Sequence, residues 1–325
     1  MDKAKKLQKE INKIFGDSPV NLVGGSVRDI ILKREPKDWD YCTPLDPDSI
    51  EEKIRAAGRK PYLIGKKFGT VGFKVSTGKE FIYVEVTTYR KEDYISGSRK
   101  PNVEFIDDLD LDLSRRDFTI NAMVLKEDLT IYDPHGGRLD ILARQIKTVG
   151  LPKDRIQEDP LRMLRAARFA SQLQFGVDPN FIGKMRQLSR SIVTVSKERW
   201  VQELDKMLMG AEPMRGIKIL IQSELMKYIL PEVYLSLLDD EAYQAIAESF
   251  EKYPEMELDS RWALLLYFIG YPYTSKEAKS GKVTFVNHEI IRKELVDGIC
   301  SRLKFSNSRR DNLLKNKLIF KTIAF

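Results

Sequence analysis

The segment 22–43, LVGGSVRDIILKREPKDWDYCT, limits what this chain can fold into more than any other stretch. An apolar run ends at Gly24-Gly25, a short helical pattern follows, and Pro36 precedes a second apolar run with Asp38 and Asp40 at its start. A strand, a glycine turn, a helix and a second strand in this order indicate mixed α/β structure. We therefore expect an α+β domain around this segment.

The two aspartates are the first candidates for chemistry. On a strand, residues i and i+2 point to the same face, so Asp38 and Asp40 should project together while Trp39 points into the core. Like charges this close repel each other unless a cation bridges them. Carboxylate oxygens suit Mg²⁺, or Mn²⁺ in its place, and a pair of such ions about 3.5–4 Å apart can clamp a phosphoryl transfer. The spacing alone also fits an exposed strand end with no metal.

The glycine turn adds a second element to the pattern. Gly24 and Gly25 stand between a strand and a helix, where backbone N–H groups can approach a phosphate. Arg28 follows within the first helical turn. Together with the carboxylate pair, this run resembles the catalytic signature of class II tRNA nucleotidyltransferases and the related bacterial poly(A) polymerases. Both groups lie within the polymerase β-like nucleotidyltransferases.

The resemblance assigns roles to the residues of the run. It implies that Asp38 and Asp40 hold the metal ions, and that the Gly24-Gly25 turn and Arg28 bind the triphosphate. Glu85, which alternates with apolar neighbours in VEVTT, stands where the family has its third catalytic carboxylate. An edge-strand glutamate is the alternative for Glu85.

Two later motifs extend the resemblance to nucleotide binding. The run 115–123, RRDFTINAM, resembles the ribose-recognition motif, with Arg116, Asp117 and Asn121 as its binding residues. The run 158–165, EDPLRMLR, resembles the nucleotide-selecting helix, which places Asp159, Arg162 and Arg165 at the base. Asp159 and Arg162 are three residues apart and share a helical face, so a simple ion pair is the alternative.

The pattern along the chain predicts an α+β head followed by helices. Domain boundaries are expected at 1–150 for the catalytic head, 151–212 for a helical neck and 213–325 for a helical body. The segment Tyr89–Val103 is polar and is expected to be a mobile loop, with Asp93 and Arg99 as its functional residues. A helix is expected at Asp48–Ala57 and another within Glu158–Leu173. Expected strands are Val20–Val23, Trp39–Cys42, Pro61–Ile64, Thr70–Val75 and Phe81–Thr87.

Composition narrows the partners and the compartment. The chain has 325 residues, a net charge of +7 and two cysteines without metal-ligand spacing. The charge favours a polyanionic partner, and residues 301–325 hold seven basic residues against one acidic residue. No apolar stretch is long enough to cross a bilayer. The first 16 residues are typical of an amphipathic helix and have no signal-peptide core. No obligate protein partner is evident. We expect a cytoplasmic protein.

The resemblance implies addition of C, C and A to the 3′ end of tRNA from CTP and ATP. A poly(A) polymerase is one alternative, because Gly65-Lys66-Lys67-Phe68 partly fits its signature, although Gly69-Thr70-Val71 continues in the nucleotidyltransferase manner. A partial adder, of CC or of A alone, is another. The loop residues Asp93 and Arg99 favour competence to add A. A catalytically dead RNA-binding protein would lack a member of the carboxylate pair, and both are present.

The body resembles that of the subgroup with an HD phosphohydrolase-like domain. That hydrolase needs an adjacent His-Asp pair, and Tyr267-Phe268 stand at its place, with His288 the only histidine left nearby. We expect the fold to be kept and the hydrolase activity to be absent. The chain is also expected to lack most of the helical tail that grips tRNA in the family.

Overall fold

The computed structural model describes residues 2–78, 80–93, 102–277 and 283–315. The chain forms two compact units, Met1–Glu158 and Asp159–Phe325. The first contains a mixed sheet and the second is mostly helical, which confirms the α+β expectation. Helix α6, Pro152–Glu158, belongs to the first unit, although the sequence placed it in the neck. The division of the second unit into neck and body stays a prediction.

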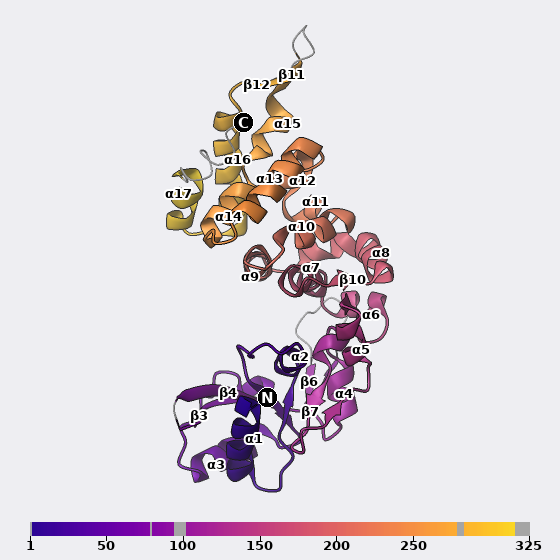
Figure 1. Ribbon diagram of the computed structural model, residues 1–325, viewed down its shortest axis with the longest axis vertical. Coiled ribbons are helices and arrows are strands. Elements are labelled where there is room, and N and C mark those ends of the chain that lie inside the picture. The colour runs from indigo at the N-terminus through magenta and orange to yellow at the C-terminus, as the bar shows by residue number, and fades with distance from the viewer. Residues whose placement is uncertain (1, 79, 94–101, 278–282, 316–325) are drawn as a thin grey trace. The chain divides into compact units, whose positions relative to one another are not determined.

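A six-stranded sheet in the order β3-β4-β2-β1-β7-β8 forms the centre of the first unit (Figure 1). Strand β2 runs parallel to β4, while β1 is antiparallel to both β2 and β7. The expected strands at 20–23, 39–42, 70–75 and 81–87 are present within a residue or two. The strands are β1 Asn21–Val23, β2 Asp40–Thr43, β3 Thr70–Ser76, β4 Phe81–Thr88, β7 Val124–Leu125 and β8 Ile131–Tyr132.

Strict alternation along β4 separates the two faces of the sheet. Ile82, Val84 and Val86 are buried, whereas Phe81, Tyr83 and Glu85 point the other way. Helices α1 (Asp2–Phe15) and α3 (Pro47–Ala56) pack on the buried side, as expected of an amphipathic helix whose Leu7, Ile11 and Phe15 are fully buried (Figure 1). The face that carries Glu85 is thereby left for chemistry.

The remaining elements of the first unit surround this sheet. Helix α2 follows the glycine turn, and α4 leads into the 115–123 motif. The bounds are α2 Gly25–Ile31, α4 Leu109–Ser114, α5 Gly137–Leu142, β9 Gln145–Ile146 and the short 3₁₀ turns η1 Lys66–Phe68 and η2 Thr119–Asn121.

Two expectations for the first unit are wrong. Pro61–Ile64 is not a strand: only Tyr62 pairs, in an isolated bridge to Gly72, because Pro61 has no amide hydrogen and a turn follows. The segment Tyr89–Val103 is not a loop throughout, since β5 (Arg90–Asp93) pairs with β6 (Asn102–Phe105). These strands are polar, so their sequence carries no apolar alternation. Residues 94–101, which include Arg99, lie outside the described residues.

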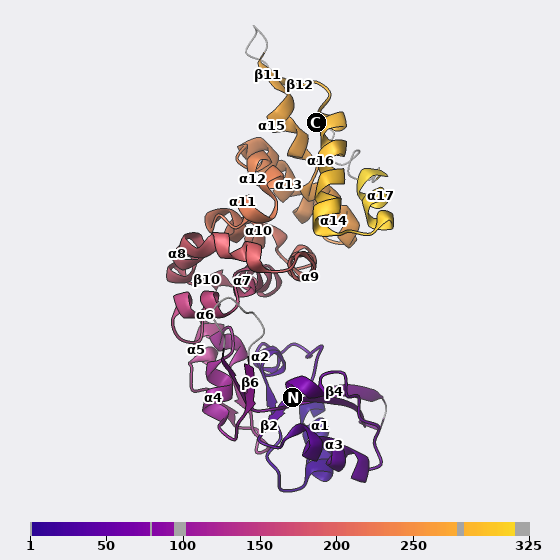
Figure 2. The same ribbon diagram turned by 180° about the vertical axis from the view of Figure 1, so that it is seen from behind.

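Helices build most of the second unit (Figure 2). The expected helix at Glu158–Leu173 is interrupted at Asp159-Pro160 because proline cannot continue the hydrogen-bond ladder of α6. A small ribbon, β11 with β12, corrects the expectation that this part is entirely helical. Its helices are α7 Leu161–Leu173, α8 Pro179–Leu188, α9 Lys197–Leu208, α10 Pro213–Gln222, α11 Met226–Ile229, α12 Pro231–Ser236, α13 Asp240–Lys252, α14 Leu258–Leu265, α15 Tyr271–Thr274, α16 His288–Leu303 and α17 Asn307–Lys315. The short elements are β10 Gly176–Val177, η3 Ser189–Thr194, η4 Phe268–Gly270, β11 Ser275–Glu277 and β12 Val283–Phe285.

Candidate active site

Three carboxylates meet at the open face of the sheet. Asp40 begins β2 and lies in direct parallel register with Glu85 on β4. Asp38 lies in the bend just before β2 rather than on the strand, and it lines the same hollow as the other two. Trp39 is buried, as the alternation predicted. The parallel pairing of β2 and β4 therefore brings Asp40 and Glu85 together, although the two residues lie far apart in the sequence.

The Asp40 carboxyl has an unusual electrostatic environment. Burial, followed by the negative charges of Glu85 and Asp38, raises its pKa to about 6, although Arg116 acts in the opposite direction. A group with this pKa is partly protonated near neutral pH. The positive charge nearby therefore does not balance the negative charge of the three carboxylates.

The donor set fits a divalent cation. Mg²⁺ takes oxygen ligands and is commonly held by one or two carboxylates, with water and substrate phosphates completing its shell. Among the described residues, no group of three or more acidic, histidine or cysteine side chains forms a ready metal cage. A bound cation would relieve the part of the rise in the pKa of Asp40 that comes from Glu85 and Asp38.

Ser26 holds the segment that carries the aspartates, a role that the sequence did not reveal. Its hydroxyl donates to the Asp38 carbonyl oxygen at 2.9 Å and accepts from the Asp40 amide at 3.3 Å. Ser26 is buried in the first turn of α2. The glycine-turn helix and the carboxylate segment are thereby joined by one side chain. The signal available in the sequence was a serine directly after the glycine pair.

The turn itself depends on glycine. Gly24 has a φ of 79°, and a Cβ there would lie 3.1 Å from Nη1 of Arg116. The Gly24 amide donates to the Met123 carbonyl oxygen at 3.1 Å, which ties the turn to the start of β7. Gly25 opens α2 beside the Arg28 guanidinium. The structure thus brings the glycine turn and Arg116 into one place.

Arg28, Asn121 and Asp117 form a chain of hydrogen bonds next to the turn. Arg28 donates to Asn121 Oδ1 at 2.7 Å and pairs with Asp29 at 2.8 Å. Asn121 donates to Asp117 Oδ1 at 3.3 Å, and that oxygen also accepts from the Phe118 amide. All three site residues are at least nine-tenths buried. The ribose-type motif is therefore fixed against the glycine-turn helix.

Arg116 is held by an acidic residue that the sequence analysis did not single out. Asp112, at 1% exposure, accepts from Arg116 Nη2 at 3.1 Å and pairs with Arg115 at 2.6 Å. Burial alone would raise the pKa of Asp112, but the Arg116 and Arg115 guanidinium groups outweigh it and lower the pKa. Among the described groups, Arg116 Nε is buried without a hydrogen-bond partner.

The predicted base-selecting residues lie on the second unit. Asp159 precedes α7, accepts from the Leu161 amide at 3.1 Å and pairs with Arg199 of α9 at 2.8 Å. Arg162 is 6% exposed in the first turn of α7. The Asp159 carboxylate is therefore engaged by Arg199 of the second unit.

Arg165 also lies near an acidic residue of α9. Glu203 of α9 lies 2.8 Å from Arg168 and 4.0 Å from Arg165. Both guanidinium groups also lie near the ring of Phe169, at 4.1 Å and 5.5 Å from its centroid. Helix α9 thus fixes the charged face of α7. The loop residue Asp93 lies on β5, where its backbone pairs with Asn102.

His288 belongs to an aromatic cluster. Its ring lies 4.9 Å from that of Tyr271, which stacks on Phe285 at 4.1 Å and contacts Phe268 at 4.9 Å. The His288 Nδ1 is 2.9 Å from the Phe285 carbonyl oxygen. The imidazole is thus packed within a cluster of aromatic side chains. The expected lack of hydrolase activity stays a prediction.

Comparison with known proteins finds similarity in both units. Residues 20–147 match the poly A polymerase head domain, and residues 174–235 match a family described as a probable RNA and SrmB-binding site of polymerase A. The CCA-adding enzyme of Bacillus subtilis (strain 168) is 38% identical over 253 residues, which cover 77% of this chain and 60% of that protein. The CCA-adding enzyme of Lactococcus lactis subsp. cremoris (strain MG1363) is 41% identical over 212 residues, covering 64% and 51%.

A solved structure aligns with nearly the whole chain. The Bacillus stearothermophilus CCA-adding enzyme in complex with CTP has a TM-score of 0.74 and 29% identity, covering 98% of this chain and 69% of its own. The chain spans 51–60% of the length of the two curated relatives described above. None of the described helices is long and apolar enough to span a membrane.

Proposed function

Because this chain belongs to the family of class II CCA-adding enzymes and poly A polymerase heads, we propose that it adds C, C and A to the 3′ end of tRNA. The substrates are CTP, ATP and a tRNA that lacks this end. The observation that carries the proposal is the Asp40–Glu85 pair in register beside the Gly24-Gly25 turn. An enzyme that acts on tRNA is expected in the cytoplasm, where we place it.

The reaction joins an RNA hydroxyl to the α-phosphate of the incoming nucleotide. The 3′-hydroxyl oxygen of the RNA bonds to the α-phosphorus, the α–β phosphoanhydride bond breaks and pyrophosphate leaves. We assign the hydroxyl proton to the carboxylate of Glu85. The glycine turn, Arg28 and Arg116 bind the triphosphate, while Asp117 and Asn121 accept and donate hydrogen bonds at the ribose.

Nucleotidyltransferases of this family typically use divalent metal ions. We propose that Asp38 and Asp40 hold Mg²⁺, or Mn²⁺ in its place, which when bound neutralises charge on the phosphates. Asp159 and Arg162 of the second unit supply an acceptor and donors for the edge of the incoming base. Arg165 is the next donor along α7.

The direct test is nucleotide addition to tRNA that lacks its CCA end. Each labelled triphosphate is offered singly and then all together, and the product is sized. Three added nucleotides, in the order C, C and A, are expected. Addition of A alone to tRNA that already ends in CC, or of CC alone, would mark a partial adder. A long run of A would mark a poly(A) polymerase, and no addition to any RNA end would overturn the proposal.

A further inference from the structure

We propose that Phe81 and Tyr83 stack on the 3′-terminal base of the RNA acceptor strand in the hollow beside the carboxylates. This hollow, of about 580 Å³, lies between the start of β4 and the segment 35–39. Its lining includes Asp38, Asp40 and Glu85 together with Phe81, Tyr83 and two lysines. The inference rests on the proposed function, because it names where the second substrate of that reaction lies.

Two exposed aromatic rings line the hollow. Phe81 is 69% exposed and Tyr83 is 45% exposed, and the alternation of β4 puts both on the face of Glu85. Neither ring contributes to the core on the other face. An aromatic ring open to solvent can stack on any nucleic-acid base, since every base has a π-face. Stacking of this kind does not depend on which base is present. It therefore suits an acceptor end whose last base changes after each addition.

The position of Tyr83 is set by its neighbours. A Cβ at Gly72 would lie 2.0 Å from the Tyr83 hydroxyl, so glycine at this point of β3 leaves the space that the ring occupies. Tyr62 contacts the ring edge-on, with centroids 5.7 Å apart. The hydroxyl donates to Glu85 Oε1 at 3.3 Å. The ring is thereby held directly beside a catalytic carboxylate.

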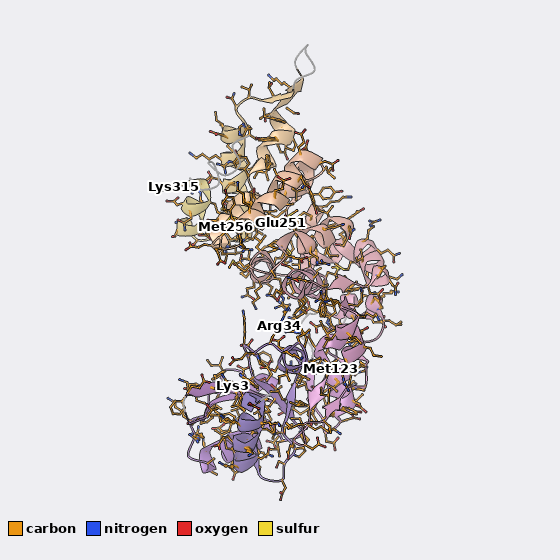
Figure 3. All side chains as sticks on the ribbon, viewed as in Figure 1. Lys3, Arg34, Met123, Glu251, Met256 and Lys315 are labelled. Carbon is orange, nitrogen blue, oxygen red and sulfur yellow. The ribbon has the colours of Figure 1, made fainter. Side chains whose placement is uncertain are left out.

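Basic side chains accompany the two rings. Lys37 is exposed at the wall of the hollow, and Lys74 is exposed on β3 directly across from Tyr83. Lys3 of α1, labelled in Figure 3, completes the wall and pairs with Glu35 at 2.6 Å and Glu80 at 2.8 Å. Lys37 and Lys74 are thus the cations beside the rings that can follow an RNA backbone, since Lys3 is already paired with carboxylates.

The sheet order decides which substrate belongs here. The glycine turn follows β1 and Asn121 precedes β7, so the proposed triphosphate residues lie on one side of β2. Strand β4 with Phe81 and Tyr83 lies on the other side. In a nucleotidyl transfer the attacking oxygen and the leaving pyrophosphate stand roughly in line across the phosphorus. The attacking 3′-hydroxyl therefore comes from the side of β4.

The test uses tRNA with the fluorescent base 2-aminopurine at its 3′ end, bound to the full chain without added nucleotide. Wild type should quench this base by stacking. Phe81→Ala and Tyr83→Ala should lose the quenching and raise KM for the tRNA about tenfold, with KM for CTP within about twofold. Tyr83→Phe keeps the ring and should retain both the quenching and the KM for tRNA. Leu142→Ala, an exposed apolar residue of α5, is the matched control.

The outcomes separate this inference from the proposed function. Unchanged quenching and unchanged tRNA KM in both alanine variants, in an enzyme that adds CCA, would overturn the acceptor site alone. A rise in the KM for CTP instead would also overturn it, since the rings would then hold the incoming base. If wild type quenches the terminal base but adds no nucleotide, the proposed reaction fails and the binding site stands.

Discussion

At the scale of single residues, the ionisation of the Asp40 carboxyl is subject to opposing electrostatic effects. Burial and two carboxylate neighbours disfavour its charge, and Arg116 favours it. Such a residue must be held in place, because its neighbours repel it. Ser26 does so through the backbone of the aspartate segment, with bonds on both sides of Trp39. The geometry of the carboxylates thus depends on a hydroxyl group outside the carboxylate cluster.

Ser26→Ala tests this positioning role. Loss of the hydroxyl leaves the Asp38 carbonyl oxygen and the Asp40 amide without this partner, at a cost of about 1–3 kcal/mol for buried groups. We expect kcat for CMP addition to fall about tenfold, with KM for CTP nearly unchanged. Ser49→Ala, which removes an exposed helix-turn hydroxyl bonded to Asp46, is the control. Equal losses in kcat and in affinity for CTP would point to a general structural defect.

At the scale of elements, the sequence predicted the helices and strands whose buried apolar residues recur at a regular spacing. Strand β4 alternates strictly and was placed within one residue, and α1 shows the apolar spacing that it buries. The ribbon β5–β6 was missed because its residues are polar and its pairing is decided by the backbone. Pairs such as Asp159 with Arg199 join residues forty positions apart, and no local pattern encodes them.

Helix α4 gives a stability prediction. Asp112→Asn removes the buried counter-charge of the Arg116 guanidinium, whose side chain is 20% exposed, and should lower the free energy of unfolding by about 3 kcal/mol at pH 7. Folding lowers the pKa of Asp112, so its contribution is present above the unfolded value of about 3.9 and is lost as the pH falls through the folded value. The difference from wild type, measured by urea unfolding, should therefore shrink below about pH 4. The exposed Asp107→Asn should behave as wild type at both pH values, and a pH-independent difference would contradict this account.

Helix α7 gives a prediction about base choice. Arg162→Ala removes donors from the proposed base edge, at roughly 1–3 kcal/mol per unpaired group. The preference for CTP and ATP over UTP and GTP should narrow by about tenfold or more. Single-nucleotide incorporation with each triphosphate measures it, with the exposed Arg190→Ala as the control. If incorporation of all four nucleotides slowed by the same factor, base selection would have to be assigned to Arg165 instead.

At the scale of the whole molecule, the chain divides the proposed work between two units. The first contains the carboxylates, the glycine turn and the ribose-type motif, and the second contains α7 with its charged face held by α9. Each group of residues is ordered by contacts within its own unit. Changes in the carboxylates should therefore abolish the chemistry and leave RNA binding intact.

The most direct measurement is single-turnover incorporation of CMP into tRNA that ends at the discriminator base, together with the Kd for that tRNA. Asp38→Asn and Asp40→Asn should each lower the rate by about a thousandfold or more, because the remaining carboxylates cannot hold the cations that offset phosphate charge. The Kd should stay within about twofold, and Asp128→Asn, at an exposed turn, should match wild type. A rate within tenfold of wild type in either variant would contradict the assignment of this carboxylate cluster as the catalytic centre.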